Sequence, residues 1–194
     1  MLGRQAKVLA PVALRRALAQ IRHHPYPERD RVILLLSVRA GLRACEIAGL
    51  TWSMVLDARG RVGVELAVHG RIAKGASGRR IPMHPELRAA LRVLYGMSPG
   101  TCPDAPVIFS AKGGAMRPNS IVNWFVQLYA ALNLEGCSSH SGRRTFITEA
   151  ARKLHKAGAS LRDVQLLAGH QSIETTQRYI DGDSHAQRKL VSLL

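Results

Sequence analysis

The sequence predicts a mainly α-helical domain with a small antiparallel β-sheet of three strands. Apolar residues recur at helical spacing over residues 11–50 and again from residue 85 onward. Between these regions, residues 55–83 hold short β-branched runs separated by glycines, which is typical of strands and turns. The chain has 194 residues, which suits one domain with a sizeable core and a small appendage.

The first third of the chain predicts three helices. Pro11 opens a helix over residues 11–24, and the prolines within residues 25–27 break it. A second helix is expected over residues 28–40, ended by Gly41, and a short third helix over residues 42–50.

The middle of the chain predicts the sheet. Valines and other apolar residues between Val55 and Ile72 indicate short strands, and residues 80–83 would form the last one. Glycines at 70, 75 and 78 indicate a long hairpin loop, and Lys74 would lie on that loop.

Helical patterns return after the sheet. They are interrupted by a loop over about 98–106 and a short extended piece over 107–110. The expected helices cover residues 85–96, 118–132, 139–156, 160–168 and 173–179, with a last amphipathic segment over 185–194.

Charge is the unusual feature of the composition. The chain carries 28 Lys and Arg against 13 Asp and Glu, a formal net charge of +15. Such an excess indicates a polyanionic partner, most simply nucleic acid. The cations are spread rather than gathered in one polybasic run, which disfavours a membrane surface as the partner. An RNA-binding protein is also possible on charge, but no aromatic-rich strand motif of the base-stacking kind is present.

The sequence also predicts the compartment. The three cysteines, Cys45, Cys102 and Cys137, are far apart and form no C-x-x-C pair, so neither a disulfide framework nor a zinc site is expected. No signal peptide and no apolar run of membrane-spanning length is evident. We therefore expect a reduced, cytoplasmic protein.

Residues 138–146, S-S-H-S-G-R-R-T-F, are the first candidate for chemistry. Ser138 or Ser139 is a natural N-cap for the helix that follows. His140 and Arg143 are three residues apart, so they share a face near the N-terminus, where free amides and the helix dipole favour an anion. Taken alone, this pair is better explained by an ordinary structural role, in which Arg143 is solvated and His140 caps the helix.

Arg43, Lys74, His170 and Tyr179 each have an ordinary structural explanation when taken singly. Arg43 and Glu46 could form an ordinary surface ion pair. Lys74 could be a solvated lysine on a hairpin. His170 follows an apparent helix end at Gly169, and Tyr179 could be half-buried packing. Their joint occurrence in a strongly basic chain is what indicates a phosphate-binding cluster with a tyrosine placed to attack.

At this point the chain resembles the tyrosine recombinases, also called the phage-integrase family. Residues 40–52 (A-G-L-R-x-x-E-I-x-x-L-x-W) are similar to its first arginine box, and residues 73–83 to its strand–lysine–strand hairpin. Residues 140–146 resemble the H-x-x-R-R-T-F box, and residues 167–179 the box that ends in tyrosine. Four boxes in the right order, over nearly the whole chain from about residue 11, make the resemblance specific.

The resemblance implies a role for each matching residue. Tyr179 would attack the scissile phosphate and form a 3′-phosphotyrosyl link, while Arg43 and Arg143 clamp the non-bridging oxygens. His140 would assist proton transfer and Lys74 would protonate the leaving 5′-oxygen. The remaining roles are a hydrogen bond from His170 to the phosphate and orientation of Arg43 by Glu46.

Elementary chemistry agrees with these roles. An anionic phosphodiester repels nucleophiles, so positioned cationic donors are the first requirement. No carboxylate cluster suggests a two-metal site, so we expect no metal and no cofactor.

The resemblance further implies double-stranded DNA as partner, and a protein that is monomeric in solution and assembles as a homo-tetramer on DNA. The expected organisation is an N-terminal extension over 1–10, a catalytic domain over 11–183, and a tail over 184–194 that packs on its own domain or docks on a neighbouring subunit. Most family members carry an additional N-terminal helical domain. The short length resembles the fimbrial DNA invertases, and a fragment or excised piece of a longer protein is the alternative.

One residue departs from the family pattern. Gly142 precedes Arg143, where an apolar residue is more usual, and is expected to loosen the start of the helix. Two other functions remain open from sequence alone: a type IB topoisomerase-like enzyme that relaxes DNA, and a non-catalytic DNA-binding protein on the same fold.

Overall fold

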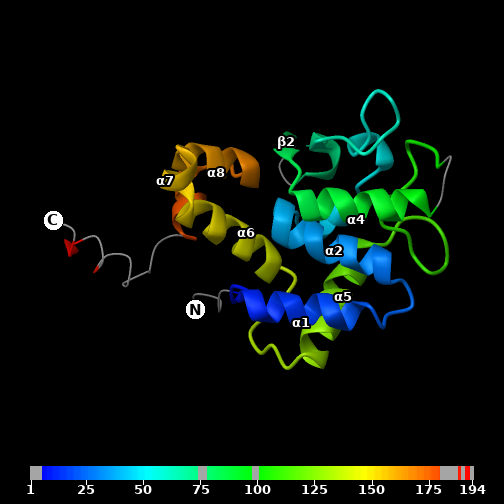
Figure 1. Ribbon diagram of the computed structural model, residues 1–194, viewed down its shortest axis with the longest axis horizontal. Helices are drawn as coiled ribbons and strands as arrows, with labels where there is room; N and C mark the ends of the chain where they lie inside the picture. The colour runs from blue at the N-terminus through cyan, green and yellow to red at the C-terminus, as the bar shows by residue number, and fades with distance from the viewer. Residues whose placement is uncertain (1–5, 74–77, 98–100, 180–187, 189–190, 193–194) are drawn as a thin grey trace.

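The computed structural model in Figure 1 describes residues 6–73, 78–97, 101–179, 188 and 191–192. The described part is mostly helical, with one small sheet. The helices are α1 (Pro11–Ile21), α2 (Pro27–Ala40), α3 (Ala44–Ala48), α4 (Pro85–Gly96), α5 (Pro118–Ala131), α6 (Ser141–Arg152), α7 (Leu154–Ala157), α8 (Leu161–Ala168) and α9 (Ile173–Gln177). The strands are β1 (Glu65–Val68) and β2 (Arg79–Pro82), and two 3₁₀ turns lie at Trp52–Met54 and Gly70–Ile72.

Helix α2 is the centre of the larger hydrophobic core. Its residues from Val32 to Leu36 are fully buried, because α1, α4, α3 and α6 pack around it. These five consecutive apolar residues cover every side of the helix, so the middle of α2 must lie inside the domain rather than on its surface. The same core takes in α5 and the inward face of the sheet.

A second, much smaller core lies under the C-terminal helices. Ile147, Val164 and Ala168 are buried there, and Leu154 and Tyr179 pack against them. In Figure 1, α6 (yellow) runs from beside α1 and α2 toward α7 and α8, so it joins the two cores. None of the helices in the described ranges combines the length and apolar character needed to cross a bilayer.

The described sheet has two antiparallel strands, not the three predicted. Leu66 faces Ile81 across the sheet, and residues 74–77, including Lys74, lie outside the described residues. The segment expected to supply a further strand makes only an isolated bridge between Leu56 and Val62. The reason is a tight turn between them, where the Asp57 carboxylate accepts the amides of Arg59 and Arg61 and competes with an extended ladder.

The helix expected over 139–156 is two helices. Lys153, with φ −105° and ψ 1°, separates α6 from α7. His140, rather than either serine, occupies the N-cap of α6. The serines serve the turn before the helix, since Ser138 Oγ accepts the His140 amide and Ser141 Oγ accepts the Ser138 amide. The expected helix over 185–194 lies mostly outside the described residues.

Gly142 has a packing role that its expected flexibility did not suggest. A Cβ on this residue would overlap the side chain of Ser37 on α2 and lie 3.1 Å from Val38 Cγ1. The absence of a side chain therefore lets the first turn of α6 approach α2 closely. This contact also fixes the position of Arg143, the next residue along α6.

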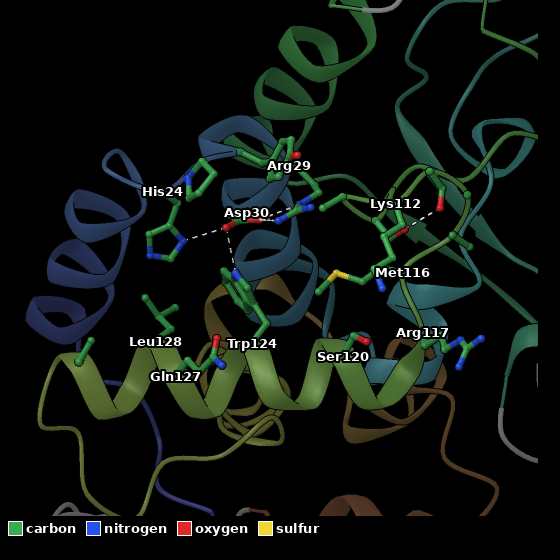
Figure 2. A pocket seen from close by; sticks show the side chains of 18 residues that line it. His24, Arg29, Asp30, Lys112, Met116, Arg117, Ser120, Trp124, Gln127 and Leu128 are labelled. Atoms are coloured by element: carbon green, nitrogen blue, oxygen red, sulfur yellow. Dashed lines mark hydrogen bonds and ion pairs between the residues drawn. The ribbon is translucent and has the colours of Figure 1, made fainter.

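The opposite end of α2 is held by a buried carboxylate (Figure 2). Asp30 is 2% exposed and accepts hydrogen bonds from Trp124 Nε1 at 3.0 Å and Arg29 Nε at 2.8 Å. His24 Nδ1 lies 2.8 Å from the same carboxylate. Arg29 also donates to the carbonyl oxygen of Phe109 and stacks over Tyr26. His24, Tyr26, Arg29, Asp30 and Trp124 are among the residues that line a cavity of about 1040 Å³ between α2 and α5.

The close approach of α6 to α2 predicts the effect of adding one methyl group. Gly142→Ala should lower the free energy of unfolding by about 1–3 kcal/mol, because α6 must move away from Ser37. Gly96→Ala is the matched control, since the helical Gly96 has open space around it, and it should be neutral or slightly stabilising. Urea denaturation of both variants measures the difference, and equal effects would contradict the packing role.

Candidate functional site

The site begins where α2 ends. Gly41 closes α2 in the left-handed region, with φ 65°, and a Cβ there would lie 2.5 Å from Phe146 Cδ1 on α6. A glycine is therefore needed both for the backbone conformation and for the contact with α6. The turn brings Arg43 to the N-terminus of α3 and leaves the Gly41 carbonyl oxygen facing Arg143.

Glu46 holds Arg43 in place. Its carboxylate is fully buried and accepts the Arg43 amide at 2.9 Å and Arg43 Nη1 at 3.1 Å. Burial alone would raise the pKa of Glu46, but the hydrogen bonds and charges of Arg79 and Arg43 outweigh burial and hold this pKa below its usual value. The predicted Arg43–Glu46 pair is thus present and mostly buried, rather than a solvated pair on the surface.

Arg79 is a further member of this cluster, and its sequence pattern did not single it out. It donates to both Glu46 oxygens, at 2.9 and 3.0 Å, and through Nε to the Leu167 carbonyl oxygen at 2.9 Å. One signal could have indicated it. Arg79 and Arg80 are neighbours on a strand, and neighbouring strand residues point to opposite faces, so one of the two must face inward. The pattern does not say which arginine faces inward, and the side chains prove to be 5% exposed for Arg79 and 76% for Arg80.

Arg143 lies at the junction of the two cores. Its Nη1 donates to the Gly41 carbonyl oxygen at 2.6 Å and its Nη2 to the Ala168 carbonyl oxygen at 2.7 Å. The residue is 3% exposed. Each terminal nitrogen carries a second N–H, so the guanidinium can still donate to an anion. Burial, and then repulsion from Arg43, lowers the pKa of Arg143 to about 10, which leaves it protonated at neutral pH.

His170 and Tyr179 complete the cluster. Gly169 ends α8, and His170 follows with its Nδ1 2.9 Å from Thr176 Oγ1. The rings of His170 and Tyr179 are stacked, with centroids 5.5 Å apart and an interplanar angle of 21°. Burial, and then the positive charges of Arg143, Arg43 and Arg79, lowers the pKa of His170 to about 4. The imidazole is therefore neutral at pH 7.

The structure brings together most of the predicted site residues. Hydrogen bonds, stacking or mutual electrostatic effects connect Arg43, Glu46, Arg143, His170 and Tyr179. His140 is exposed at the N-cap of α6, one turn before Arg143. Lys74 lies outside the described residues, so its place relative to the cluster stays a prediction.

The cavity in Figure 2 is separate from this cluster. It lies at the N-terminal end of α2, whereas Gly41 and Arg43 follow its C-terminal end, about 20 Å away for a helix of this length. Within the described residues, no three His, Cys, Asp or Glu side chains converge as metal ligands would. The three cysteines are unpaired.

The electrostatic character of the cluster is that of an anion site. Arg43 and Arg79 both pair with the carboxylate of Glu46, and Arg143 lies near enough to feel the charges of all three, which leaves positive charge in excess. The main-chain carbonyls at the ends of α2 and α8 orient Arg143 rather than neutralise it. Such an excess of positive donors is suited to binding a tetrahedral oxyanion.

The model of the phage integrase family matches residues 7–185 of this chain. The chain belongs to the phage integrase family. Among relatives, it is 34% identical over 158 residues to tyrosine recombinase XerC of Rhodospirillum centenum, a match covering 80% of this chain and 43% of that protein. It is 32% identical over 169 residues to XerC of Rhizobium meliloti, covering 86% and 50% of the two chains. The chain thus spans about half the length of these relatives.

Solved structures of the phage integrase family share the fold. XerA recombinase superposes with a TM-score of 0.74 at 20% identity, covering all of this chain and 65% of XerA. XerH bound to its difH substrate gives 0.70 at 19% identity, covering 99% of this chain and 55% of XerH. The predicted class, mainly helical with a small antiparallel sheet and like a tyrosine recombinase catalytic domain, is confirmed, although the sheet described here has two strands rather than three.

The neutral state of His170 predicts a dependence of stability on pH. The folded-state pKa of about 4 lies below the ordinary value of 6.5, so between these values the unfolded chain binds a proton that the folded chain does not. The contribution of His170 is complete above pH 6.5 and is lost as the pH falls toward 4. Between pH 7 and pH 5 the loss should amount to roughly 2 kcal/mol of unfolding free energy.

Urea denaturation at pH 7 and pH 5 measures this contribution as the difference between the parent chain and His170→Gln. The variant should lose less stability on acidification than the parent. His155→Gln removes an exposed histidine and should keep the parent's pH dependence. An identical pH dependence in His170→Gln and the parent would contradict the assignment of a neutral, desolvated imidazole.

Proposed function

We propose that this chain is the catalytic part of a site-specific DNA recombinase, which cleaves and rejoins double-stranded DNA through a 3′-phosphotyrosyl intermediate. The observation that carries the proposal is the stacking of the Tyr179 ring on His170, next to the positive charges of Arg143 and Arg43. Membership of the phage integrase family supports it. So does the excess of positive charge, +15 over the chain.

In the proposed reaction, the Tyr179 phenol oxygen attacks the scissile phosphorus, forming a new P–O bond while the bond to the 5′-oxygen breaks. His140 takes up the phenol proton, and Lys74 supplies a proton to the leaving 5′-oxygen. Arg43 and Arg143 donate to the two non-bridging oxygens, where negative charge increases in the transition state. His170, neutral but still able to donate one N–H, adds a further hydrogen bond to the phosphate.

The reverse reaction gives rejoining. The 5′-hydroxyl of a DNA strand attacks the phosphotyrosyl phosphorus, and Tyr179 leaves with its proton restored. Because the phosphotyrosyl bond is itself a phosphodiester of similar free energy, rejoining consumes no nucleoside triphosphate. We propose that the chain is monomeric in solution, works in the cytoplasm and assembles as a tetramer on two DNA duplexes when exchange takes place.

Tyr179→Phe should abolish the covalent adduct while leaving DNA affinity nearly unchanged, because only the attacking oxygen is removed. The assay uses nicked suicide duplexes, taken from DNA that flanks the gene, and detects the adduct on a denaturing gel. Tyr95→Phe is the matched control. Tyr95 is also half-buried, but its ring packs against Trp52 and not against a residue of the cluster. An adduct that persists in Tyr179→Phe would remove Tyr179 from the proposed role.

A further inference from the structure

We propose that Arg79 is a positioning residue of the recombination site, and that it aligns Arg43 and the Leu167–His170 segment through Glu46 and the end of α8. The proposal rests on the function proposed above and names a residue beyond the six expected to contact the phosphate and beyond Glu46. Its evidence is the set of partners that the Arg79 side chain takes, since each of them holds another site residue.

The first partner is Glu46. The two terminal nitrogens of Arg79 meet the two carboxylate oxygens one to one, at 2.9 and 3.0 Å, which is the parallel fork geometry of a strong arginine–carboxylate pair. Each of these oxygens also accepts one hydrogen bond from Arg43. Arg79 therefore fixes the plane of the carboxylate, and the carboxylate fixes Arg43. A lysine at position 79 would keep the charge but could not set this plane.

The second partner is the end of α8. Arg79 Nε donates to the Leu167 carbonyl oxygen, and the next carbonyl oxygen, that of Ala168, accepts from Arg143. Gly169 follows, and a Cβ on it would lie 3.0 Å from Arg79 Cδ, so the Arg79 stem packs directly on this turn. His170 is the residue after Gly169. The Arg79 guanidinium thus connects the segment that carries Arg43 to the segment that carries His170.

The position of Arg79 in the sheet extends this connection. Arg79 is the first residue of β2 and pairs with Val68 of β1, and Lys74 comes between these two residues in the sequence. The charge of Arg79 also acts on the cluster, because it contributes to lowering the pKa of both Arg143 and His170. Among the described residues, the Arg79 guanidinium donates to Glu46 and to the Leu167 carbonyl oxygen, and its side chain is 5% exposed. We therefore assign it a positioning role rather than contact with the substrate.

The test compares Arg79→Gln and Arg79→Lys by single-turnover adduct formation on suicide duplexes at saturating DNA. Both variants should cleave roughly 10- to 100-fold more slowly than the parent, as is common when an orienting partner is lost. DNA affinity should change less than about threefold, because the Arg79 side chain is buried. A parent-like cleavage rate in Arg79→Gln would overturn the proposal.

Arg29→Gln is the matched control for the structural cost of losing a buried arginine. Arg29 pairs with a buried carboxylate, Asp30, and a backbone carbonyl oxygen, as Arg79 does, but at the far end of α2. It should lower the thermal midpoint while its cleavage rate at saturating DNA stays within about twofold of the parent. If Arg29→Gln slows cleavage as much as Arg79→Gln, or if both Arg79 variants fail to fold, Arg79 serves the fold alone and the proposal is wrong.

A double-mutant cycle with Glu46→Gln tests the route of the effect. If Arg79 acts through Glu46, the double variant should cleave no more slowly than the worse single variant, because the second change removes an interaction already lost. Independent, multiplicative losses would overturn the proposed route.

A measurement without DNA separates this proposal from the proposed function. If the parent chain forms no adduct, the recombinase function fails, and the His170 pKa by NMR then decides on Arg79. His170 is flanked by Arg143 of α6, Arg43, Arg79 of β2, and the stacked Tyr179. Arg79→Gln should raise the pKa of His170, whereas Arg29→Gln should not. An unchanged pKa together with unchanged ring chemical shifts of His170 in Arg79→Gln would overturn the positioning role independently of any reaction.

Discussion

Glu46 is a fully buried carboxylate, and the geometry of the site follows from how that charge is satisfied. A buried carboxylate without partners would cost several kcal/mol. Two arginines from distant segments, Arg43 and Arg79, each donate to both of its oxygens. Satisfying one negative charge in this way assembles several positive ones, and Arg143 lies close enough for Arg43 to lower its pKa. The cluster is thus organised before any anion arrives, which is the condition for strong electrostatic stabilisation of a transition state.

The main chain does the rest of the positioning. The C-terminal ends of α2 and α8 each present a carbonyl oxygen to Arg143, where the negative end of a helix dipole favours a cation. Both helix ends turn at a glycine in the left-handed region, Gly41 and Gly169. Gly142 allows α6 to lie close enough to α2 for this bridge to form. The site therefore lies on the seam between the two cores, and its members come from both sides.

Tyr179 belongs to the smaller core. It packs against the cluster formed by Ile147, Val164 and Ala168, and its ring stacks on His170. Thr148 on α6 also donates weakly, at 3.4 Å, to the Tyr179 carbonyl oxygen. Among the described residues, α9 packs mainly on α8, whereas α2 lies between α1, α3, α4 and α6. We therefore expect the segment that carries the proposed nucleophile to have a lower local stability than the arginine cluster, which would let it adjust to a bound phosphate.

The sequence by itself determined the helices of both halves, because their apolar periodicity and their proline and glycine boundaries are local signals. It also determined the family, since the four boxes are read along the chain, and it indicated Arg43, Arg143, His170 and Tyr179 as one set. The pattern at residues 55–62 predicted a strand, but there the Asp57 carboxylate favours a turn. No local signal predicted the break at Lys153 between α6 and α7.

Only the tertiary structure decided which arginine of the 79–80 pair is buried, that Gly142 makes room for α2, and that Arg143 spans two helix ends. These facts depend on segments far apart in the chain meeting at one point, and burial of that kind leaves no periodic trace in the sequence around each residue.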